Sequence, residues 1–246
     1  MKPTIPHSRP AIGEAEVEAV AGILRSGQLA QGLEVEAFEN EMAAFTGRRY
    51  AVAVSSGTAA LHLGLLALGV SEGQKVIVPS YVCTALLHAV WASGAEPVVC
   101  DTYSRSGNID PVAAERVLED RTAAIIVPHM FGLAAEIEKL VALGTPCIED
   151  CAMSIGATRA GRPLGSFGEL SVCSFYATKM LAAGEGGMVL TDREDLAMAV
   201  RELRAYDGVP ARSLRSERGC PKASYISASP IIRANSWISS PLSPLG

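Results

Sequence analysis

The stretch that decides the fold is Ser171-Val172-Cys173-Ser174-Phe175-Tyr176-Ala177-Thr178-Lys179-Met180-Leu181-Ala182-Ala183-Gly184-Glu185-Gly186-Gly187-Met188-Val189-Leu190-Thr191. Its apolar ends, from Leu170 to Phe175 and from Met188 to Thr191, predict two buried strands. The loop between them holds one lysine, Lys179, just ahead of a glycine-rich turn that begins at Gly184. The stretch therefore predicts a lysine sheltered between two strands of a covered sheet.

Lys179 has two interpretations. An ordinary loop lysine is solvated and has no special role. A sheltered lysine loses its proton more easily and can act as a nucleophilic amine toward an aldehyde. The usual aldehyde in proteins is pyridoxal phosphate, which forms a Schiff base with lysine. The stretch alone leaves both interpretations open.

Composition favours one large α/β domain, with or without an appendage. Of the 246 residues, 49% are apolar and 19% are charged, which is enough apolar material for a sizeable core. A net charge of −5 argues against a basic nucleic-acid surface. The apolar runs are too short for a membrane span, and the N-terminus lacks a secretory core. We therefore expect a cytoplasmic protein without nucleic-acid or membrane partners.

The cysteines and histidines indicate neither disulfides nor a metal site. The six cysteines form no Cys-x-x-Cys pair and mostly lie in apolar runs, as expected for buried free thiols in a reducing cytosol. The four histidines have no metal-ligand spacing. We expect no bound metal and a structural role for each histidine, although His129 follows a strand and could lie near a functional edge.

Residues 50–208 alternate between predicted strands and helices. The short links and the continuous apolar strands predict an α/β fold with a mainly parallel sheet and helices on both faces. The expected strands are 50–54, 75–78, 97–100, 123–127 and 147–148, and the expected helices between and after them are 59–68, 82–92, 111–118, 134–143 and 193–205.

The flanking segments differ from this central region. Residues 1–49 read as an N-terminal helical segment, with helices at 14–24 and 34–45. Residues 209–246 contain nine serines and five prolines and hold no regular periodicity. That composition predicts a disordered tail. The expected organisation is thus a helical segment, one domain over 50–208 and an irregular tail.

Several polar groups follow predicted strands. They are Ser56 to Thr58, Tyr81 to Thr84, Asp150 and Lys179. Ligands of open α/β sheets bind at the carboxyl ends of the strands. We therefore expect these groups along one edge of the sheet.

The turn Ser55-Ser56-Gly57-Thr58 joins a strand to a helix. Free N–H groups and the helix dipole make such a junction an anion site, and small side chains would let a phosphate approach. The alternative is an ordinary helix cap by Ser56 or Thr58. On its own, the turn favours the cap.

The pair Glu149-Asp150 ends a strand. A carboxylate there could bind a metal, act as a base, cap a helix or pair with the protonated nitrogen of a pyridine ring. We favour Asp150, because strand alternation points the two side chains to opposite faces. Ser174 ends the strand before Lys179, and its hydroxyl is either a phosphate donor or a small polar residue at the core edge.

Taken together, these motifs resemble the DegT/DnrJ-type family of pyridoxal-phosphate-dependent sugar aminotransferases. The resemblance runs in order over about residues 5–208. It is carried by Ile5-Pro6-His7-Ser8-Arg9-Pro10, Ser26-Gly27-Gln28-Leu29-Ala30-Gln31-Gly32, Ser55-Ser56-Gly57-Thr58-Ala59-Ala60-Leu61-His62-Leu63, Gly94-Ala95-Glu96-Pro97-Val98 with Asp101, Ile148-Glu149-Asp150-Cys151-Ala152, Ser174-Phe175-Tyr176-Ala177-Thr178-Lys179 and Gly184-Glu185-Gly186-Gly187.

The resemblance implies a fold-type-I, aspartate-aminotransferase-like large domain with a seven-stranded sheet, in a homodimer with active sites at the interface. It implies that Lys179 carries pyridoxal phosphate as a Schiff base and then moves the proton. Asp150 would pair with the pyridine nitrogen, and Ser174 with the turn Gly57-Thr58-Ala59 would hold the phosphate. The implied reaction moves an amino group, usually from glutamate, to a keto group of a nucleotide-linked sugar for polysaccharide or antibiotic synthesis.

The sequence departs from the family in three places. Met153 replaces a polar residue near the cofactor ring, and Cys83 stands where an aromatic residue usually stacks on it, with Tyr81 two residues away. After residue 208 the similarity ends where the family continues into a small domain, and the tail resembles the product of a frameshift or truncation. The alternative function is a non-catalytic fragment that binds the cofactor or pairs with a full-length homologue. A Rossmann oxidoreductase is disfavoured, because the turn after residue 54 lacks its glycine fingerprint.

Overall fold

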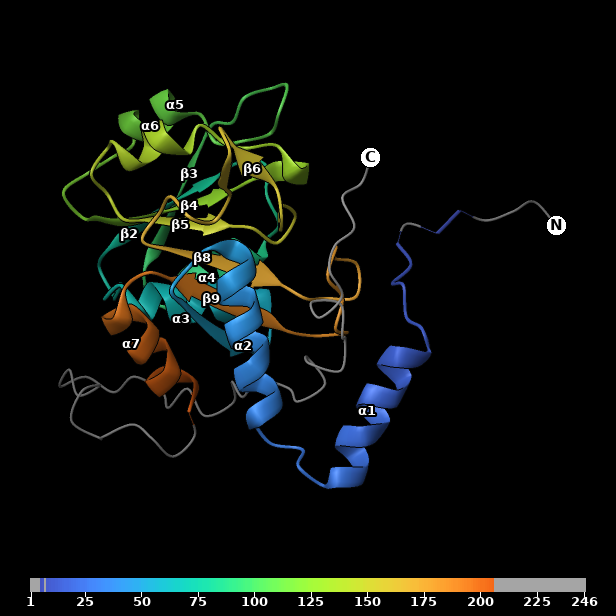
Figure 1. Cartoon of the computed structure of the whole chain (residues 1–246). Coiled ribbons are helices and arrows are strands. Elements are labelled where there is room, and N and C mark those ends of the chain that lie inside the picture. The colour runs from blue at the N-terminus through green and yellow to red at the C-terminus, as the bar shows by residue number, and fades with distance from the viewer. Residues whose placement is uncertain (1–4, 7, 206–246) are drawn as a thin grey trace.

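A computed structural model describes residues 5–6 and 8–205 of the chain. A seven-stranded sheet runs through its centre in the order β1-β9-β8-β5-β4-β2-β3 (Figure 1). The sheet strands are β1 (Tyr50–Val54), β2 (Lys75–Pro79), β3 (Glu96–Cys100), β4 (Thr122–Pro128), β5 (Cys147–Asp150), β8 (Leu170–Ser174) and β9 (Gly187–Thr191).

The sheet is mainly parallel, as the sequence predicts. The strands β3, β2, β4, β5 and β8 run parallel to their neighbours, and only β9 is antiparallel, to β8 on one side and β1 on the other. The parallel strands bring their carboxyl ends to one edge. Because β9 is reversed, its first residue, Gly187, lies opposite Val54 and Ser174 at that same edge.

One face of the sheet is covered by α3 (Gly57–Ala67), α4 (Ala85–Ala92) and α7 (Glu194–Arg204). Alternate strand residues such as Val52, Val76 and Ile126 point into this core and are almost fully buried. Helix α3 is rich in alanine and leucine, which favours a helix that can pack closely over the middle of the sheet. This layer places the first turn of α3 directly after β1.

The opposite face is covered by α2 (Leu33–Thr46) over one half and by α5 (Pro111–Arg116) and α6 (Ile137–Val141) over the other (Figure 1). The intervening strand residues face this side, with Ala51 and Met188 under α2 and Ile125 under α5 and α6. Both faces are therefore covered, and this explains why the strands read as continuous apolar runs.

Three details differ from the sequence-based expectation. The predicted helix at 134–143 shortens to α6, because the N–H of Ala135 donates to the ring of His129 instead of starting a helix. Helix α4 begins at Ala85 rather than at residue 82, since the chain first makes a turn closed by the bond from Leu86 N to Cys83 O. The 3-10 turn η1 (Met130–Gly132) and the hairpin of β6 (Thr158–Arg159) and β7 (Arg162–Pro163) were not predicted.

The two helices predicted within residues 1–49 are present as α1 and α2. Helix α1 (Glu14–Ser26) has no buried residue and stands apart from the sheet in Figure 1, whereas α2 packs on it. The predicted division into 1–49, 50–208 and 209–246 stays a prediction, and its tail lies outside the described residues. In the described part of the chain, no helix has the length and apolarity needed to cross a membrane.

The cysteines of the described chain are mostly buried, as the sequence predicts. The five described cysteines are free thiols; Cys83 is exposed and the other four are buried, and burial raises the pKa of Cys147 to about 12. Across residues 5–6 and 8–205, no three His, Cys, Asp or Glu side chains gather to hold a metal ion.

A buried ion pair joins α2, α7 and β1. The carboxylate of Glu39 on α2 accepts hydrogen bonds from Arg204 Nη1 at 2.5 Å and from the N–H of Ala53 at 2.9 Å. The Arg204 and Glu39 side chains are only 5% and 8% exposed. A buried cation is tolerated only when it is paired. Glu39 therefore holds the two helices against the edge strand β1.

We expect Glu39→Ala to lower the free energy of unfolding by about 3–5 kcal/mol, because the change leaves the Arg204 guanidinium buried without its carboxylate. Urea unfolding followed by circular dichroism measures the loss. The control is Glu36→Ala, which removes an exposed carboxylate from the same helix. Equal unfolding midpoints for the two variants would show that the pair does not stabilise the domain.

Candidate functional site

The lysine loop is closed by backbone hydrogen bonds on both sides. The N–H of Phe175 donates to Gly186 O at 2.8 Å, and the N–H of Ala177 donates to Gly184 O at 3.1 Å. Lys179 is half-buried and follows a turn in which its own N–H donates to Tyr176 O at 2.9 Å. The loop thus presents Lys179 beyond the carboxyl end of β8, at the predicted edge.

Asp150 ends β5, the strand beside β8. Its Oδ1 accepts a hydrogen bond from the N–H of Ala152 at 2.9 Å. Burial raises the pKa of the Asp150 carboxyl, and the Ala152 hydrogen bond and the positive charge of Lys179 oppose that rise only in part. The lysine and the aspartate are therefore electrostatic neighbours, although Asp150 ends β5 and Lys179 lies in the loop after β8.

The turn before α3 meets the ends of β8 and β9. Ser56 Oγ accepts a hydrogen bond from the N–H of Ala59 at 3.1 Å and so caps the helix. A Cβ added to Gly57 would lie 2.8 Å from Ser174 Cβ, and one added to Gly187 would lie 2.2 Å from Ser56 O. Only glycine allows these approaches, which bring the turn, Ser174 and the glycine-rich segment together.

The helix-cap and anion-site interpretations of this turn are compatible. Ser56 is the cap, while the first N–H groups of α3, from Gly57 onward, have no partner within the helix. Those donors and the positive end of the helix dipole point toward an anion. Thr58 is exposed and Ala59 is buried, so of these two side chains only the Thr58 hydroxyl is open to a ligand.

Cys83 and Met153 lie at the same edge but are less closely joined to the lysine. The Cys83 side chain is exposed, and Met153 is 37% exposed. Tyr81 packs on the backbone of Gly107, where an added Cβ would lie 2.8 Å from the ring. Among the described residues, no side-chain hydrogen bond or ion pair connects Cys83 or Met153 with Asp150 or Lys179.

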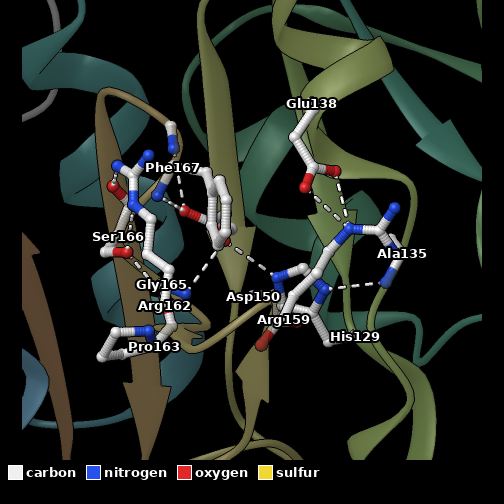
Figure 2. A network of polar contacts seen from close by, with 12 residues as sticks. His129, Ala135, Glu138, Asp150, Arg159, Arg162, Pro163, Gly165, Ser166 and Phe167 are labelled. Carbon is white, nitrogen blue, oxygen red and sulfur yellow. Dashed lines mark hydrogen bonds and ion pairs between the residues drawn. The ribbon is translucent and has the colours of Figure 1, made fainter.

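The sequence analysis favoured Asp150 over Glu149 and did not predict the buried hydrogen-bond network around Glu149. As strand alternation predicts, Glu149 points away from Asp150, but its carboxylate is fully buried and accepts four hydrogen bonds. The donors are His129 Nε2 at 3.0 Å and the N–H groups of Gly165 at 2.9 Å, Phe167 at 2.6 Å and Gly168 at 2.8 Å. We call these five residues the Glu149 network; His129, Gly165 and Phe167 of this network are labelled in Figure 2.

Glu149 is held ionised by this network. Burial by itself would raise the pKa of the Glu149 carboxyl, but the hydrogen bonds from His129, Gly168 and Gly165 outweigh burial and lower it. The sequence signal that could have found it is a charged residue inside an apolar strand, because such a residue needs several donors to be buried.

Arg48 supports the same loop from the other side. Its Nε donates to Gly165 O and its Nη2 to Gly168 O, both at 2.7 Å. The guanidinium also pairs with Asp192 at 2.8 Å and lies 3.7 Å from Glu149 Oε1. The segment from Gly165 to Gly168 is thereby fixed against β5 and β8, the two strands that carry Asp150 and Ser174.

The sequence profile of the DegT/DnrJ/EryC1/StrS aminotransferase family matches residues 10–218, which is most of the chain. The chain belongs to this family. The family match covers both the turn at Gly57 and the loop at Lys179, the two segments that the fold brings to one edge.

Individual relatives agree with the family match. The chain is 40% identical over 206 residues to the spore coat polysaccharide biosynthesis protein SpsC of Bacillus subtilis, a match that covers 82% of this chain and 53% of that relative. It superimposes with a TM-score of 0.85 and 25% identity on Spr1654 from Streptococcus pneumoniae in its PLP-form, covering 94% of this chain and 64% of that one. The chain therefore spans about half the length of its curated relative.

A second similar structure was solved in the presence of a sugar product. DesI, solved in the presence of its TDP-sugar product, matches with a TM-score of 0.84 and 31% identity over 97% of this chain and 61% of that one. These similarities confirm the fold-type-I α/β architecture expected from the sequence. The matched family is an aminotransferase family whose structural relatives include sugar aminotransferases, and the PLP- and PMP-forms of Spr1654 indicate pyridoxal phosphate as the cofactor for the site.

Proposed function

We propose that the chain carries the cofactor-binding domain of an aminotransferase that moves an amino group from an amino acid, with glutamate as the donor, to a keto group of a nucleotide-linked sugar. Family membership supports the reaction class. The sugar acceptor is supported by the likeness to DesI with its TDP-sugar product and to the polysaccharide protein SpsC. The single observation that carries the proposal is that Lys179 and Asp150 follow the neighbouring strands β8 and β5 at one edge of the sheet, near enough for the lysine charge to act on the pKa of Asp150.

The described residues suit pyridoxal phosphate at both ends of the cofactor. At one end, the half-buried Asp150 carboxyl has a raised pKa and only one oxygen hydrogen-bonded within the described chain, so a protonated ring nitrogen would supply the missing partner. At the other end, a Cβ on Gly57 would fill the space against Ser174 beside the free N–H groups of α3. An acidic end and a dipolar anion end are what the cofactor's charges require.

When bound, pyridoxal phosphate supplies an electron sink for the carbon that loses or gains a proton. Lys179 would attach to the cofactor through Nζ and, once released, carry a proton to and from the reacting carbon. Asp150 would keep the ring nitrogen protonated, while Ser174 and the turn Gly57-Thr58-Ala59 would hold the phosphate. The donors in that turn would be the Thr58 hydroxyl and the N–H groups of Gly57 and Thr58, because the Ala59 N–H already donates to Ser56 Oγ. Cys83 and Met153 would lie against the ring, with less stacking area and one polar contact fewer than an aromatic and a polar residue give.

The partners and location follow from the same proposal. We expect the active form to be a homodimer in the cytoplasm, where nucleotide-linked sugars and glutamate are available. The site edge is open in the described chain: Tyr176 and Met180, which flank the lysine, are 47% and 60% exposed. A second subunit or further chain would cover such a surface.

The proposal is tested by single-turnover transfer. Purified protein is loaded with pyridoxal phosphate, mixed with glutamate, separated from free amino acid and then given a panel of nucleotide-linked keto sugars. We expect 2-oxoglutarate in the first half and an amino sugar in the second, each about equal in amount to the bound cofactor. Bound cofactor with no amine transfer in either half would contradict the proposal and favour the non-catalytic alternative.

A further inference from the structure

His129 is the imidazole of the Glu149 network, and its tautomer can be read from its partners. It follows β4, is 1% exposed and uses both ring nitrogens. Nδ1 accepts the N–H of Ala135 at 3.1 Å, so the ring proton is on Nε2, which donates to Glu149 at 3.0 Å. Figure 2 shows the Ala135 contact. The Ala135 N–H thus fixes the ring in the tautomer whose Nε2 donates to Glu149.

The same residue also holds the main chain of Asp150. The N–H of His129 donates to Asp150 O at 3.2 Å, and its neighbour Pro128 pairs with Asp150 in the sheet. His129 therefore grips two consecutive residues at the end of β5. Its ring donates to the side chain of Glu149, and its main-chain N–H donates to the carbonyl of Asp150.

The other hydrogen bonds to the Glu149 carboxylate come from the loop of residues 165–168. The donors are the N–H groups of Gly165, Phe167 and Gly168. A Cβ on Gly165 would lie 2.9 Å from Cys151 Sγ, so this loop packs directly on the residue after Asp150. A shift of β5 at Asp150 would strain several buried hydrogen bonds at once, each costly to leave unmade.

We propose that His129 and Glu149 are positioning residues for Asp150, which fix its carboxylate toward the ring nitrogen of the cofactor. The inference rests on the proposed function, since it needs a cofactor at Asp150. Neither residue touches substrate or cofactor in this role. Their effect passes through the orientation of the Asp150 carboxylate, and therefore through the proton on the cofactor's ring nitrogen.

Two matched variants separate the contacts of His129. His129→Gln places an amide nitrogen near the position of Nε2 and so keeps a donor for Glu149. His129→Asn places its amide near Nδ1, keeps an acceptor for Ala135 and loses the bond to Glu149. A merely structural role predicts similar damage from both, because each keeps one hydrogen bond. The proposed role predicts that glutamine rescues the site and asparagine does not.

The measurement is the dissociation constant of pyridoxal phosphate, titrated by absorbance, together with the pH dependence of the bound ring's spectrum. We expect His129→Asn to weaken binding about tenfold, the scale for loss of a hydrogen bond to a charged group. The spectral transition should move to lower pH, because a misplaced Asp150 holds the ring proton less firmly. His129→Gln should change binding less than about threefold.

A double-mutant cycle with Asp150→Asn completes the test. In that background, His129→Asn should weaken cofactor binding no further. Equal losses from Asn and Gln, or the same loss with and without Asp150, would overturn the inference.

If wild-type protein binds the cofactor and His129→Asn binds it equally well, only this inference fails; if wild type does not bind, the proposed function fails and the inference with it. Should His129→Asn not fold, as judged by urea unfolding, Glu149→Gln replaces it in the same cycle.

Discussion

Replacing Lys179 with alanine is expected to abolish amino transfer, with a loss of at least about 10⁴-fold in single-turnover rate. The side chain supplies both the amine that attaches to the cofactor and the group that moves the proton, so one substitution removes two functions. The absorbance band of the lysine-bound cofactor should disappear at the same time. Rapid-mixing spectroscopy with glutamate and a keto sugar measures both effects.

The control for this experiment is Lys139→Ala. Lys139 lies on α6, is exposed and pairs only locally with Glu136, so its removal takes away one lysine without touching the site edge. It should leave the absorbance band and the rate unchanged. A Lys179→Ala protein that still transfers at more than about a hundredth of the wild-type rate would show that another amine serves the reaction.

Replacing Asp150 with asparagine is expected to lower the transfer rate by about 10²–10³-fold, the usual loss when one preorganised electrostatic group is removed. The variant keeps the size of the side chain and the hydrogen bond to the Ala152 N–H, so the fold should survive. What disappears is the negative charge that would hold a proton on the ring nitrogen. The rate and the spectrum of the bound cofactor should therefore change together.

The matched control is Asp195→Asn, at an exposed position in the first turn of α7. Its carboxylate pairs with Arg193 after the end of β9 that lies opposite the site edge, and a rate within twofold of wild type is expected. If Asp150→Asn retains the wild-type rate and spectrum, the ring nitrogen has no functional partner at this position.

The sequence predicted the sheet and the edge that carries the site, for physical reasons visible in single residues. Val52, Ile126 and Val189 lie in continuous apolar runs, because each strand is covered on both faces. The carboxyl-end rule then placed Asp150 and Lys179 at one edge, and the charge of Lys179 does act on Asp150. The roles of Cys83 and Met153 toward the cofactor stay predictions.

The sequence could not predict the contacts that cross the chain. Glu149 receives hydrogen bonds from His129 and from Gly165, Phe167 and Gly168, and neither periodicity nor propensity encodes such partners. The same network removed the expected start of a helix near residue 134, because the His129 ring takes the Ala135 N–H. Tertiary contacts overrode local propensity there.

The reversed strand β9 also sets an order of assembly. Strand β1 is one of the two edge strands of the sheet. Within residues 5–6 and 8–205 it pairs only with β9, which the ribosome makes near the end of this range. During synthesis, the backbone N–H and C=O groups of β1 therefore have no strand partner until residues 187–191 emerge from the ribosome. Such long-range pairings are slow to form and expose strand edges to other chains. The turn at Gly57, which meets Gly187 and Ser174, is accordingly among the last parts of the domain to be built.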